Sequence, residues 1–183
     1  DYDNINSDGL HLLYLGAINN IIDIPKIISV VKLLSEKRKV HLDIVGGGER
    51  KTEFIKSLET AGVTVTDNGS VFDEKKKQEI MDSCHYGINI MKDTVCVGLS
   101  MKSIDYLKGG LPIINNLDAD IGELISKNNC GVNIYDDAWD TGIDDAEKIR
   151  SMKINAKQAF DKYFSEEVFS NQIEKLFSDI SKV

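Results

Sequence analysis

Short apolar runs alternate along the chain with longer segments of helical periodicity. The apolar runs predict six β-strands, near residues 10–15, 40–45, 63–67, 87–91, 112–115 and 132–135. The segments between them repeat apolar residues every three or four positions, the spacing of a helix that buries one face. Strict alternation of strands and helices predicts a parallel sheet with helices on both faces. We therefore expect an α/β fold: one Rossmann-like domain over residues 1–183 with a six-stranded parallel sheet.

Residues that commonly begin or end helices stand between these runs. They are Pro25 for a first turn, Gly62 for an end, Asp73 for a cap, and Asp120 with Glu123 for a capping box. After the last strand, residues 144–181 are helical in pattern throughout. These signals support the helical assignment of the intervening segments.

Residues 165–181 carry an apolar stripe that is too wide for a helix that packs against a single surface. Its members are Val168, Phe169, Ile173, Leu176, Phe177 and Ile180. We predict that at least two of the six are partly exposed and form a patch capable of weak self-association at high concentration. The alternative is that all six are buried in the core of this domain.

Length, charge and composition exclude several classes of protein. A length of 183 residues fits one domain, and a net charge of −8 argues against a nucleic-acid partner. No apolar run reaches the about 18 residues of a membrane span, and the acidic start is unlike a signal peptide. The cysteines, Cys84, Cys96 and Cys130, are unpatterned and predict small buried thiols in a reducing compartment.

We therefore expect a cytoplasmic protein. The start lacks an initiator methionine and lies nine residues before the first strand, so we expect a fragment of a longer protein. Any membrane contact, peripheral at the inner membrane face, is expected only through missing parts.

The most informative segment is residues 97–116. A turn of small residues at Gly98, Leu99 and Ser100 precedes a short helix, so free backbone N–H groups and the positive end of a helix dipole can face an anion. Asp105 follows about 1.5 turns later, where its carboxylate can accept hydrogen bonds from hydroxyl groups. Phosphate at the turn and hydroxyls at the carboxylate together indicate a nucleotide or a sugar nucleotide.

A motif in this segment resembles a known family. The pattern K-x-x-D-Y-x-x-x-G-x-P is formed by Lys102, Asp105, Tyr106, Gly110 and Pro112. It is similar to the donor-site segment of GT-B glycosyltransferases of the family-4 kind, in which Glu or Asp stands at the acidic position. The runs LLYLGAI, HLDIVGGGE, DNGSV and GINIM follow in the order of that family's carboxyl-terminal half, over residues 10–180.

The resemblance implies roles for several residues. Asp105 would hold the donor ribose, the turn 98–100 would face the diphosphate, and the loops at Gly16, Gly47 and Val71 would border the donor. It also implies that the acceptor site and the general base belong to an amino-terminal domain absent from this chain. No catalytic residue is therefore assigned here.

This sequence departs from the family pattern at positively charged positions. Many family members have an arginine directly after Gly16 and a lysine several residues later, whereas this chain has Ala17 and then Ile22 and Asp23. Such cations stabilise a leaving diphosphate. Lys102, or Lys92 after the fourth strand, is the candidate replacement. The first acid of the family's E-x7-E pattern also falls at Gly98.

No metal or cofactor site is expected. Asp118 and Asp120 form a DxD sequence, but Asp120 is better explained as a helix cap, and two loop carboxylates are a poor cation site. The histidines, His11, His41 and His85, have no partner at metal-ligand spacing in the sequence. The glycines 46–48 do not form a dinucleotide fingerprint.

The leading hypothesis is the donor-binding domain of a glycosyltransferase of the hexosyltransferase type. The full-length protein would transfer a sugar from a nucleoside-diphosphate sugar to an acceptor hydroxyl without a metal, in bacterial polysaccharide or glycoconjugate synthesis, and the fragment alone would be inactive. The alternatives are half of a sugar-nucleotide epimerase and a non-catalytic flavodoxin-like binding module. The sequence does not identify the sugar, the base, the acceptor or the stereochemical outcome.

Overall fold

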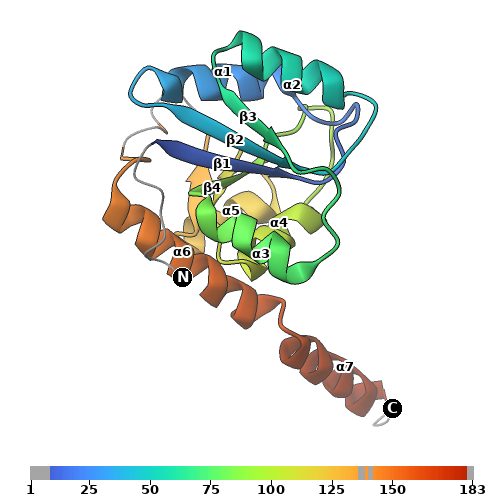
Figure 1. Cartoon of the computed structure of the whole chain (residues 1–183). Helices are drawn as coiled ribbons and strands as arrows, with labels where there is room; N and C mark the ends of the chain where they lie inside the picture. Colours follow the sequence, from blue (N-terminus) through green and yellow to red (C-terminus); the bar gives the residue numbers. More distant parts are fainter. Residues whose placement is uncertain (1–8, 136–138, 140–141, 181–183) are drawn as a thin grey trace.

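The predicted six-stranded parallel sheet is confirmed. A computed structural model describes residues 9–135, 139 and 142–180 (Figure 1). Its strands are β1 (Leu10–Leu15), β2 (Val40–Val45), β3 (Thr64–Asp67), β4 (Tyr86–Asn89), β5 (Ile113–Asn115) and β6 (Gly131–Asn133). They form one sheet in the order β3-β2-β1-β4-β5-β6, and all pairs are parallel. This is the doubly wound Rossmann order, and it differs from the flavodoxin-like order 2-1-3-4-5, so a flavodoxin-like sheet is wrong.

Helices cover both faces of the sheet. They are α1 (Ile24–Ser35), α2 (Lys51–Thr60), α3 (Glu74–Ser83), α4 (Met101–Lys108), α5 (Asp120–Asn128), α6 (Ala146–Tyr163) and α7 (Glu166–Ile180). Figure 1 shows α1 and α2 on one face and α3, α4, α5 and α6 on the other. Alternate residues of β1 therefore enter two cores: Leu12 packs with Phe54 on the first face, and Leu13 packs with Leu107 and Ile121 on the second. None of the helices within the described residues is long and apolar enough to cross a membrane.

Most of the predicted helix signals are confirmed. Pro25 lies in the first turn of α1, and the Asp73 carboxylate caps α3 by accepting a hydrogen bond from the Lys76 N–H at 2.7 Å. Gly62 follows α2 with a φ of +81°, a conformation that glycine adopts at little cost. The cap assigned to Asp120 is wrong. Helix α5 begins at Asp120 itself, and Ala119 at the cap position makes no side-chain hydrogen bond.

Other boundaries also differ from the prediction. Strands expected at 87–91 and 132–135 span Tyr86–Asn89 and Gly131–Asn133. The helical pattern over 144–181 is interrupted between α6 and α7 at Phe164 and Ser165. Of the thiols, Cys84 and Cys130 are buried as expected, whereas Cys96 is exposed.

A buried phenol fixes α4 against the sheet. The Tyr106 side chain is fully buried, and its hydroxyl accepts a hydrogen bond from the Leu15 N–H at 2.8 Å. The same oxygen lies within donating distance of two carbonyl oxygens, those of Leu13 at 3.1 Å and Ile88 at 3.3 Å. Burial raises the pKa of this phenol well above its ordinary value, so it stays neutral and keeps its proton. Tyr106 therefore joins α4 to both β1 and β4.

Removing this hydroxyl should destabilise the fold. In Tyr106→Phe the Leu15 N–H loses its partner in a packed interior, and we expect the free energy of unfolding to fall by about 1–3 kcal/mol. Urea denaturation followed by circular dichroism measures this. The control is Tyr163→Phe on the surface of α6, which should change stability by less than about 0.5 kcal/mol. Equal unfolding free energies for the parent and Tyr106→Phe would contradict the assignment.

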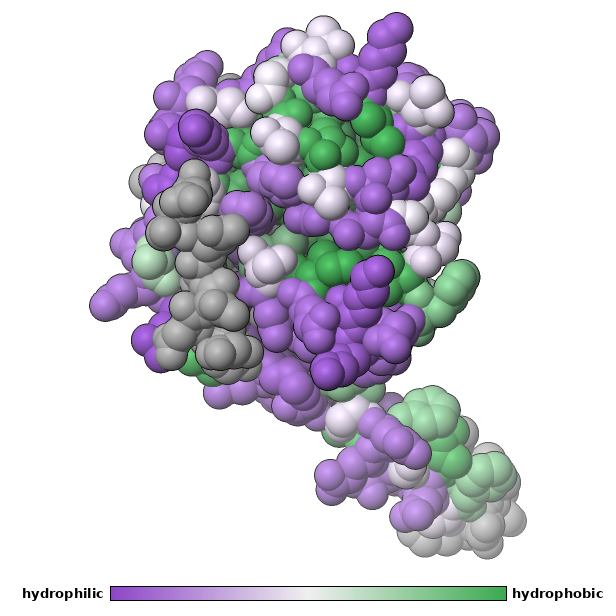
Figure 2. All heavy atoms as spheres, in the orientation of Figure 1, coloured by the Kyte–Doolittle hydropathy of each residue, from purple (hydrophilic) through white to green (hydrophobic). Residues whose placement is uncertain are grey.

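The prediction of exposed apolar side chains at the carboxyl-terminal end is confirmed. Helix α7 projects away from the sheet, and apolar residues colour much of it green (Figures 1 and 2). Phe169, Ile173 and Phe177 are 63%, 38% and 64% exposed. Val168 is half-buried, while the side chains of Leu176 and Ile180 lie outside the described part of the chain. The alternative, in which all six residues are buried in this domain, is wrong.

This exposed stripe should cause weak self-association. We expect the sedimentation coefficient of the chain to rise with protein concentration, because pairing of two α7 helices removes apolar surface from water. The double variant Phe169→Ser, Phe177→Ser should remain monomeric. The control Ile154→Ser removes an exposed apolar side chain from α6 (38% exposed) and should associate like the parent. A concentration-independent parent would contradict this expectation.

Candidate functional site

Loops from three neighbouring strands meet at the carboxyl edge of the sheet. The Ile18 N–H donates to the Gly47 carbonyl at 2.8 Å, and the Gly46 N–H donates to the Gly69 carbonyl at 2.7 Å. Gly46 has a φ of +142°, and a Cβ atom on it would lie 2.1 Å from the Gly16 carbonyl oxygen. Only glycine permits this approach, so the loops after β1, β2 and β3 form one continuous surface. Gly16 and Gly47, both predicted to border a ligand, lie together there.

Lys102 reaches this surface from the first turn of α4. Its ammonium lies 3.1 Å from the Tyr14 hydroxyl oxygen and 4.3 Å from the centre of the Tyr14 ring. The Tyr14 hydroxyl donates to the Ala17 carbonyl at 2.9 Å, which leaves its oxygen free to accept from Lys102. A Cβ atom on Gly16 would lie 4.0 Å from Lys102 Cε. The structure therefore brings Lys102 beside the loop in which Ala17 replaces the expected arginine.

Burial lowers the pKa of Lys102 to about 8. At pH 7 the side chain is still mainly protonated, and it loses its charge as the pH rises through about 8. A partly desolvated cation at this edge is a binding group for anions, because its charge is less screened than in water.

The amino-terminal end of α4 adds backbone donors. Within the described part of the chain, no protein group accepts a hydrogen bond from the N–H groups of Ser100, Met101 and Lys102. The first N–H groups of a helix are unpaired in this way, and with the helix dipole they bind phosphates. The predicted turn and helix are therefore present, and the Ser100 hydroxyl oxygen also caps the helix by accepting from the Ser103 N–H at 3.3 Å.

A row of three asparagines, two of them buried, supports this turn, and it was not predicted from the sequence. The Asn89 amide donates to the Asn115 side chain at 2.9 Å, and the Asn115 amide donates to Asn133 at 2.8 Å. The Ser100 hydroxyl donates to the Asn89 side-chain Oδ1 at 3.2 Å. Each asparagine ends its strand, and the three are paired in the sheet register. The available signal was an asparagine within each of three consecutive predicted strands.

Asp120 lies beside the turn instead of capping its helix. Its exposed carboxylate would be 2.6 Å from a Cβ atom placed on Gly98, and the Gly98 carbonyl accepts from the Ile121 N–H at 3.0 Å. A larger residue at 98 would require this exposed carboxylate to move. Asp118 and Asp120 belong to no group of three potential metal ligands among the described residues.

Asp105 lies in different surroundings from Lys102. It is half-buried and lines a small hollow of about 30 Å³ between α3 and α4, together with Glu74, Lys77 and Lys108. Lys77 and Lys108 pair with Glu74 at 2.6 and 3.4 Å, and both lower the pKa of the Glu74 carboxyl. The two lysines are therefore paired with Glu74 and leave the Asp105 carboxylate available to a ligand.

The remaining predicted residues lie near this edge. Val71 and Leu99 are half-buried and pack against the core on the α4 face. Lys92, the other candidate cation, follows β4, and its N–H donates to the Ile21 carbonyl at 2.9 Å. A further cation that the sequence reasoning missed is Lys51, whose ammonium donates to the Gly46 carbonyl at 2.9 Å and pairs with an aspartate of β3. Lys51 therefore holds the loop after β2 in place.

Comparisons with known proteins add to this geometry. No family model and no curated protein matches the sequence. Among solved structures, a sucrose-phosphate synthase from Thermosynechococcus elongatus matches with a TM-score of 0.72 and 13% identity, over 98% of this chain and 47% of that chain. The protein HepE of Anabaena, in complex with UDP and glucose, matches with a TM-score of 0.71 and 13% identity, over 94% and 49%. WaaG, a glycosyltransferase involved in lipopolysaccharide biosynthesis, matches with a TM-score of 0.59 and 14% identity, over 92% and 46%.

These matches show the fold. The chain has the architecture of one half of GT-B glycosyltransferases, and it spans about half the length of the three structures. The fold-class prediction is confirmed. The roles assigned to individual residues stay predictions.

The pKa of Lys102 leads to a test that needs no knowledge of the ligand. Sulfate keeps its charge between about pH 7 and pH 9.5, and we expect its affinity to fall about tenfold over that range as Lys102 loses its proton. Chemical-shift titration at both pH values measures this. In Lys102→Arg the guanidinium stays charged, so the affinity should hardly change with pH. A parent chain with equal sulfate affinity at both pH values would exclude Lys102 as an anion ligand.

Proposed function

We propose that this chain is the donor-binding domain of a glycosyltransferase that uses a nucleoside-diphosphate sugar. The observation that carries the proposal is the carboxyl edge, where Lys102 and the unpaired N–H groups of α4 lie beside the glycine loops after β1 and β2. Ligands of open α/β sheets bind at this edge. The matching HepE structures contain UDP and glucose in one case and UDP-glucose in another, which supports a donor of this class.

Each part of the edge has a role in this proposal. The diphosphate binds the N–H groups at residues 98–102 and the Lys102 ammonium, which stabilise the negative charge that develops when the diphosphate leaves. Asp105 accepts hydrogen bonds from the ribose hydroxyls. Gly16 and Gly47 allow the donor to approach the backbone, and Val71 borders it. Lys102 takes the place of the cations that are missing at Ala17 and Ile22.

The complete reaction requires more than this chain. We propose that an amino-terminal domain supplies the acceptor site and the general base, so the chain alone binds donor without turnover. Transfer of a hexose to an acceptor hydroxyl in bacterial polysaccharide or glycoconjugate synthesis fits the matching WaaG structure, which is involved in lipopolysaccharide biosynthesis. Donor binding is proposed to need no metal, and the protein to work in the cytoplasm or at the inner membrane face.

Calorimetric titration with UDP, GDP and ADP tests the proposal. We expect one of them to bind, and Asp105→Ala to weaken its binding by about 1.5–3 kcal/mol, the range for hydrogen bonds to a charged group. The control Glu59→Ala removes a carboxylate from the exposed surface of α2 and should bind like the parent.

The titration can also reject the proposal. If none of the nucleotides binds the parent chain, a non-catalytic binding module is favoured. If Asp105→Ala binds as tightly as the parent, the ribose role of Asp105 is wrong. Conversion of the sugar on a bound donor by the full-length protein, without transfer to an acceptor, would favour the epimerase alternative.

A further inference from the structure

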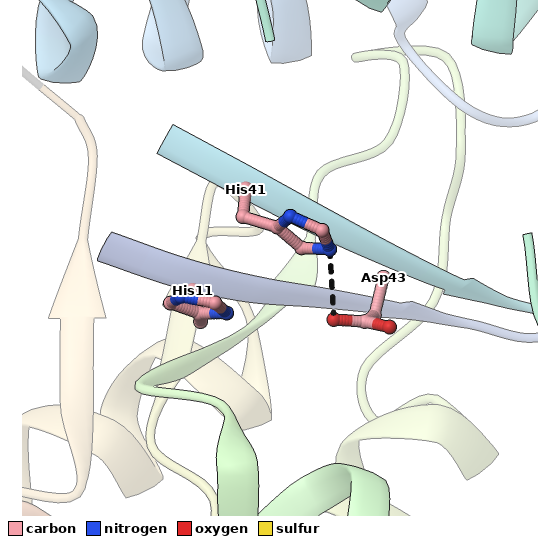
Figure 3. A group of neighbouring side chains, drawn as sticks. All are labelled: His11, His41 and Asp43. Atoms are coloured by element: carbon pink, nitrogen blue, oxygen red, sulfur yellow. Dashed lines mark ion pairs between the residues drawn. The ribbon is translucent and has the colours of Figure 1, made fainter. Parts of the chain in front are cut away.

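Three polar side chains meet on the sheet face that α3 and α6 cover, towards the amino-terminal ends of the strands. They are His11 from β1 and His41 and Asp43 from β2 (Figure 3). The sequence predicts no partner for these histidines at metal-ligand spacing, and for His11 and His41 the structure corrects this. The parallel register places His11 directly opposite His41, and Asp43 follows two residues later on the same face.

Their geometry is close to that of a metal site. The His41 Nε2 atom lies 3.5 Å from the Asp43 Oδ2 atom, and the two imidazole rings stack with centroids 5.0 Å apart. One nitrogen of each histidine and one oxygen of Asp43 all lie within 4.8 Å of one another. A tetrahedral ion with bonds of ~2.0–2.2 Å holds its ligand atoms about 3.4 Å apart. The two rings, which are now nearly parallel (19° between their planes), must rotate so that their in-plane lone pairs converge on one ion with the Asp43 oxygen.

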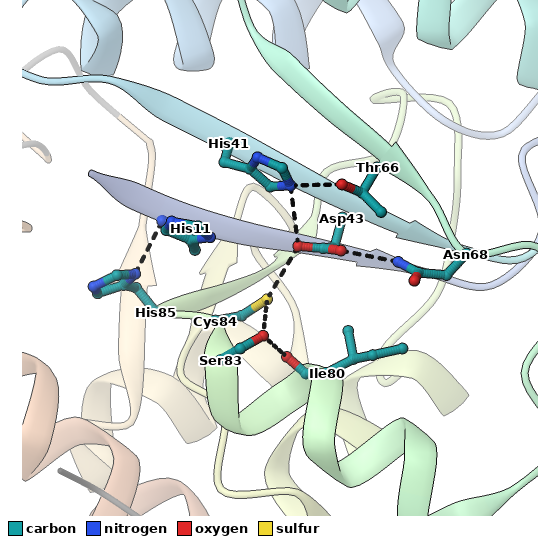
Figure 4. A network of polar contacts seen from close by, with 9 residues as sticks. All are labelled: His11, His41, Asp43, Thr66, Asn68, Ile80, Ser83, Cys84 and His85. Carbon is teal, nitrogen blue, oxygen red and sulfur yellow. Dashed lines mark hydrogen bonds and ion pairs between the residues drawn. The ribbon is translucent and has the colours of Figure 1, made fainter. Parts of the chain in front are cut away.

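Neighbouring residues orient these groups (Figure 4). The Asn68 amide donates to Asp43 Oδ1 at 2.9 Å, which leaves Oδ2 facing His41. The backbone N–H of His11 donates to His85 Nδ1 at 2.9 Å, which fixes the strand at that point. Hydrogen bonds from surrounding residues that orient the ligands are typical of metal sites.

Cys84 and Thr66 also lie near the three side chains, and their distances show whether they belong to the ligand set. The Cys84 sulfur is 4.0 Å from Asp43 Oδ2 but falls outside the group of mutually close ligand atoms. The Thr66 hydroxyl is 2.9 Å from His41 Nε2 and competes with an ion for that nitrogen. The ligand set is therefore two imidazoles and one carboxylate.

We propose that His11, His41 and Asp43 bind a divalent transition-metal ion of the Zn²⁺ class, with a fourth position open to water. Imidazole nitrogens favour such ions over Mg²⁺ and Ca²⁺, which prefer oxygen ligands. All three residues are half-buried, and the His41 and Asp43 side chains keep 24% and 14% of their surface exposed, so the group is in contact with solvent. His11 lies four residues before the end of β1, about 13 Å from the carboxyl edge at ~3.3 Å per residue. The ion therefore links β1 to β2 and takes no part in donor binding.

The first experiment is calorimetric titration of the metal-free full chain with ZnCl₂. We expect one ion per chain, and an affinity at least about 100-fold lower in His41→Gln and in Asp43→Asn, which lose a ligand. His85→Asn is the matched control, because its side-chain oxygen can still accept from the His11 N–H and the ligands are kept. Thr66→Val removes the competing hydroxyl and should bind Zn²⁺ at least as tightly as the parent. Equal affinity of His41→Gln and the parent overturns the proposal.

A second experiment uses the parent chain alone, so it does not depend on the variants folding. The chain has three histidines, and Zn²⁺ should shift the ring resonances of His11 and His41 more than those of His85, whose ring lies 5.9 Å from that of His11. Saturation at 100 times the Kd should raise the melting temperature by about 5–10 °C. Unshifted His11 and His41 resonances overturn the proposal. So does a thiolate-to-metal absorption band with Co²⁺ that persists in Cys96→Ser and is lost in Cys84→Ser, which would show Cys84 as a ligand.

The metal site and the donor site can be separated. EDTA should remove the Zn²⁺ and lower the melting temperature, while the affinity for the nucleoside diphosphate stays the same. Failure of Zn²⁺ binding leaves that nucleotide affinity untouched, and failure of nucleotide binding leaves the Zn²⁺ titration untouched. A nucleotide affinity that falls with EDTA and returns with Zn²⁺ contradicts the separation of the two sites.

Discussion

The contacts of the Tyr106 hydroxyl fix the position of α4, and the candidate site depends on that position. Helix α4 has only eight residues, so a single buried anchor to β1 and β4 determines where its first turn lies. Lys102 stands four residues before Tyr106 and so projects from the same side of the helix, over Tyr14 of β1. The hydrogen bonds of the buried Tyr106 hydroxyl therefore hold the exposed first turn of α4, and Lys102 with it, in position. This explains structurally why tyrosine stands next to the acidic residue in the motif.

The architecture could be predicted from the sequence because it depends on which residues are buried, and burial appears in the sequence as a pattern of apolar residues. The central strands are covered on both faces and appear as apolar runs, and the helices between them show one buried face. Boundaries were less predictable because they depend on single hydrogen bonds. Asp120 has the residue type of a cap but lies inside α5, and the break at Phe164 and Ser165 does not interrupt an apolar pattern that both helices share.

The candidate site was only partly predictable, because its contacts join residues from different elements. A motif within one segment identified the turn at 98–100 and the helix that carries Lys102. The contacts of Lys102 with Tyr14 and of Asp120 with Gly98 could not be predicted without knowing where α4 lies relative to β1 and α5. The pairing of His11 with His41 could not be predicted without the strand register, since a shift of one residue would place the two rings on opposite faces of the sheet.

The two ends of the sheet differ in chemistry for a physical reason. At the carboxyl edge, the start of α4 leaves backbone N–H groups without a partner among the described residues, which favours anions. Towards the amino-terminal ends, the face bearing His11, His41 and Asp43 is incompletely covered: α3 buries only Met81, and the three side chains are half-buried. Polar groups can occupy such positions without the full cost of desolvation. The same short helix that leaves this face open to solvent also starts beside the hollow that contains Asp105, so α3 shapes the surroundings of both sites.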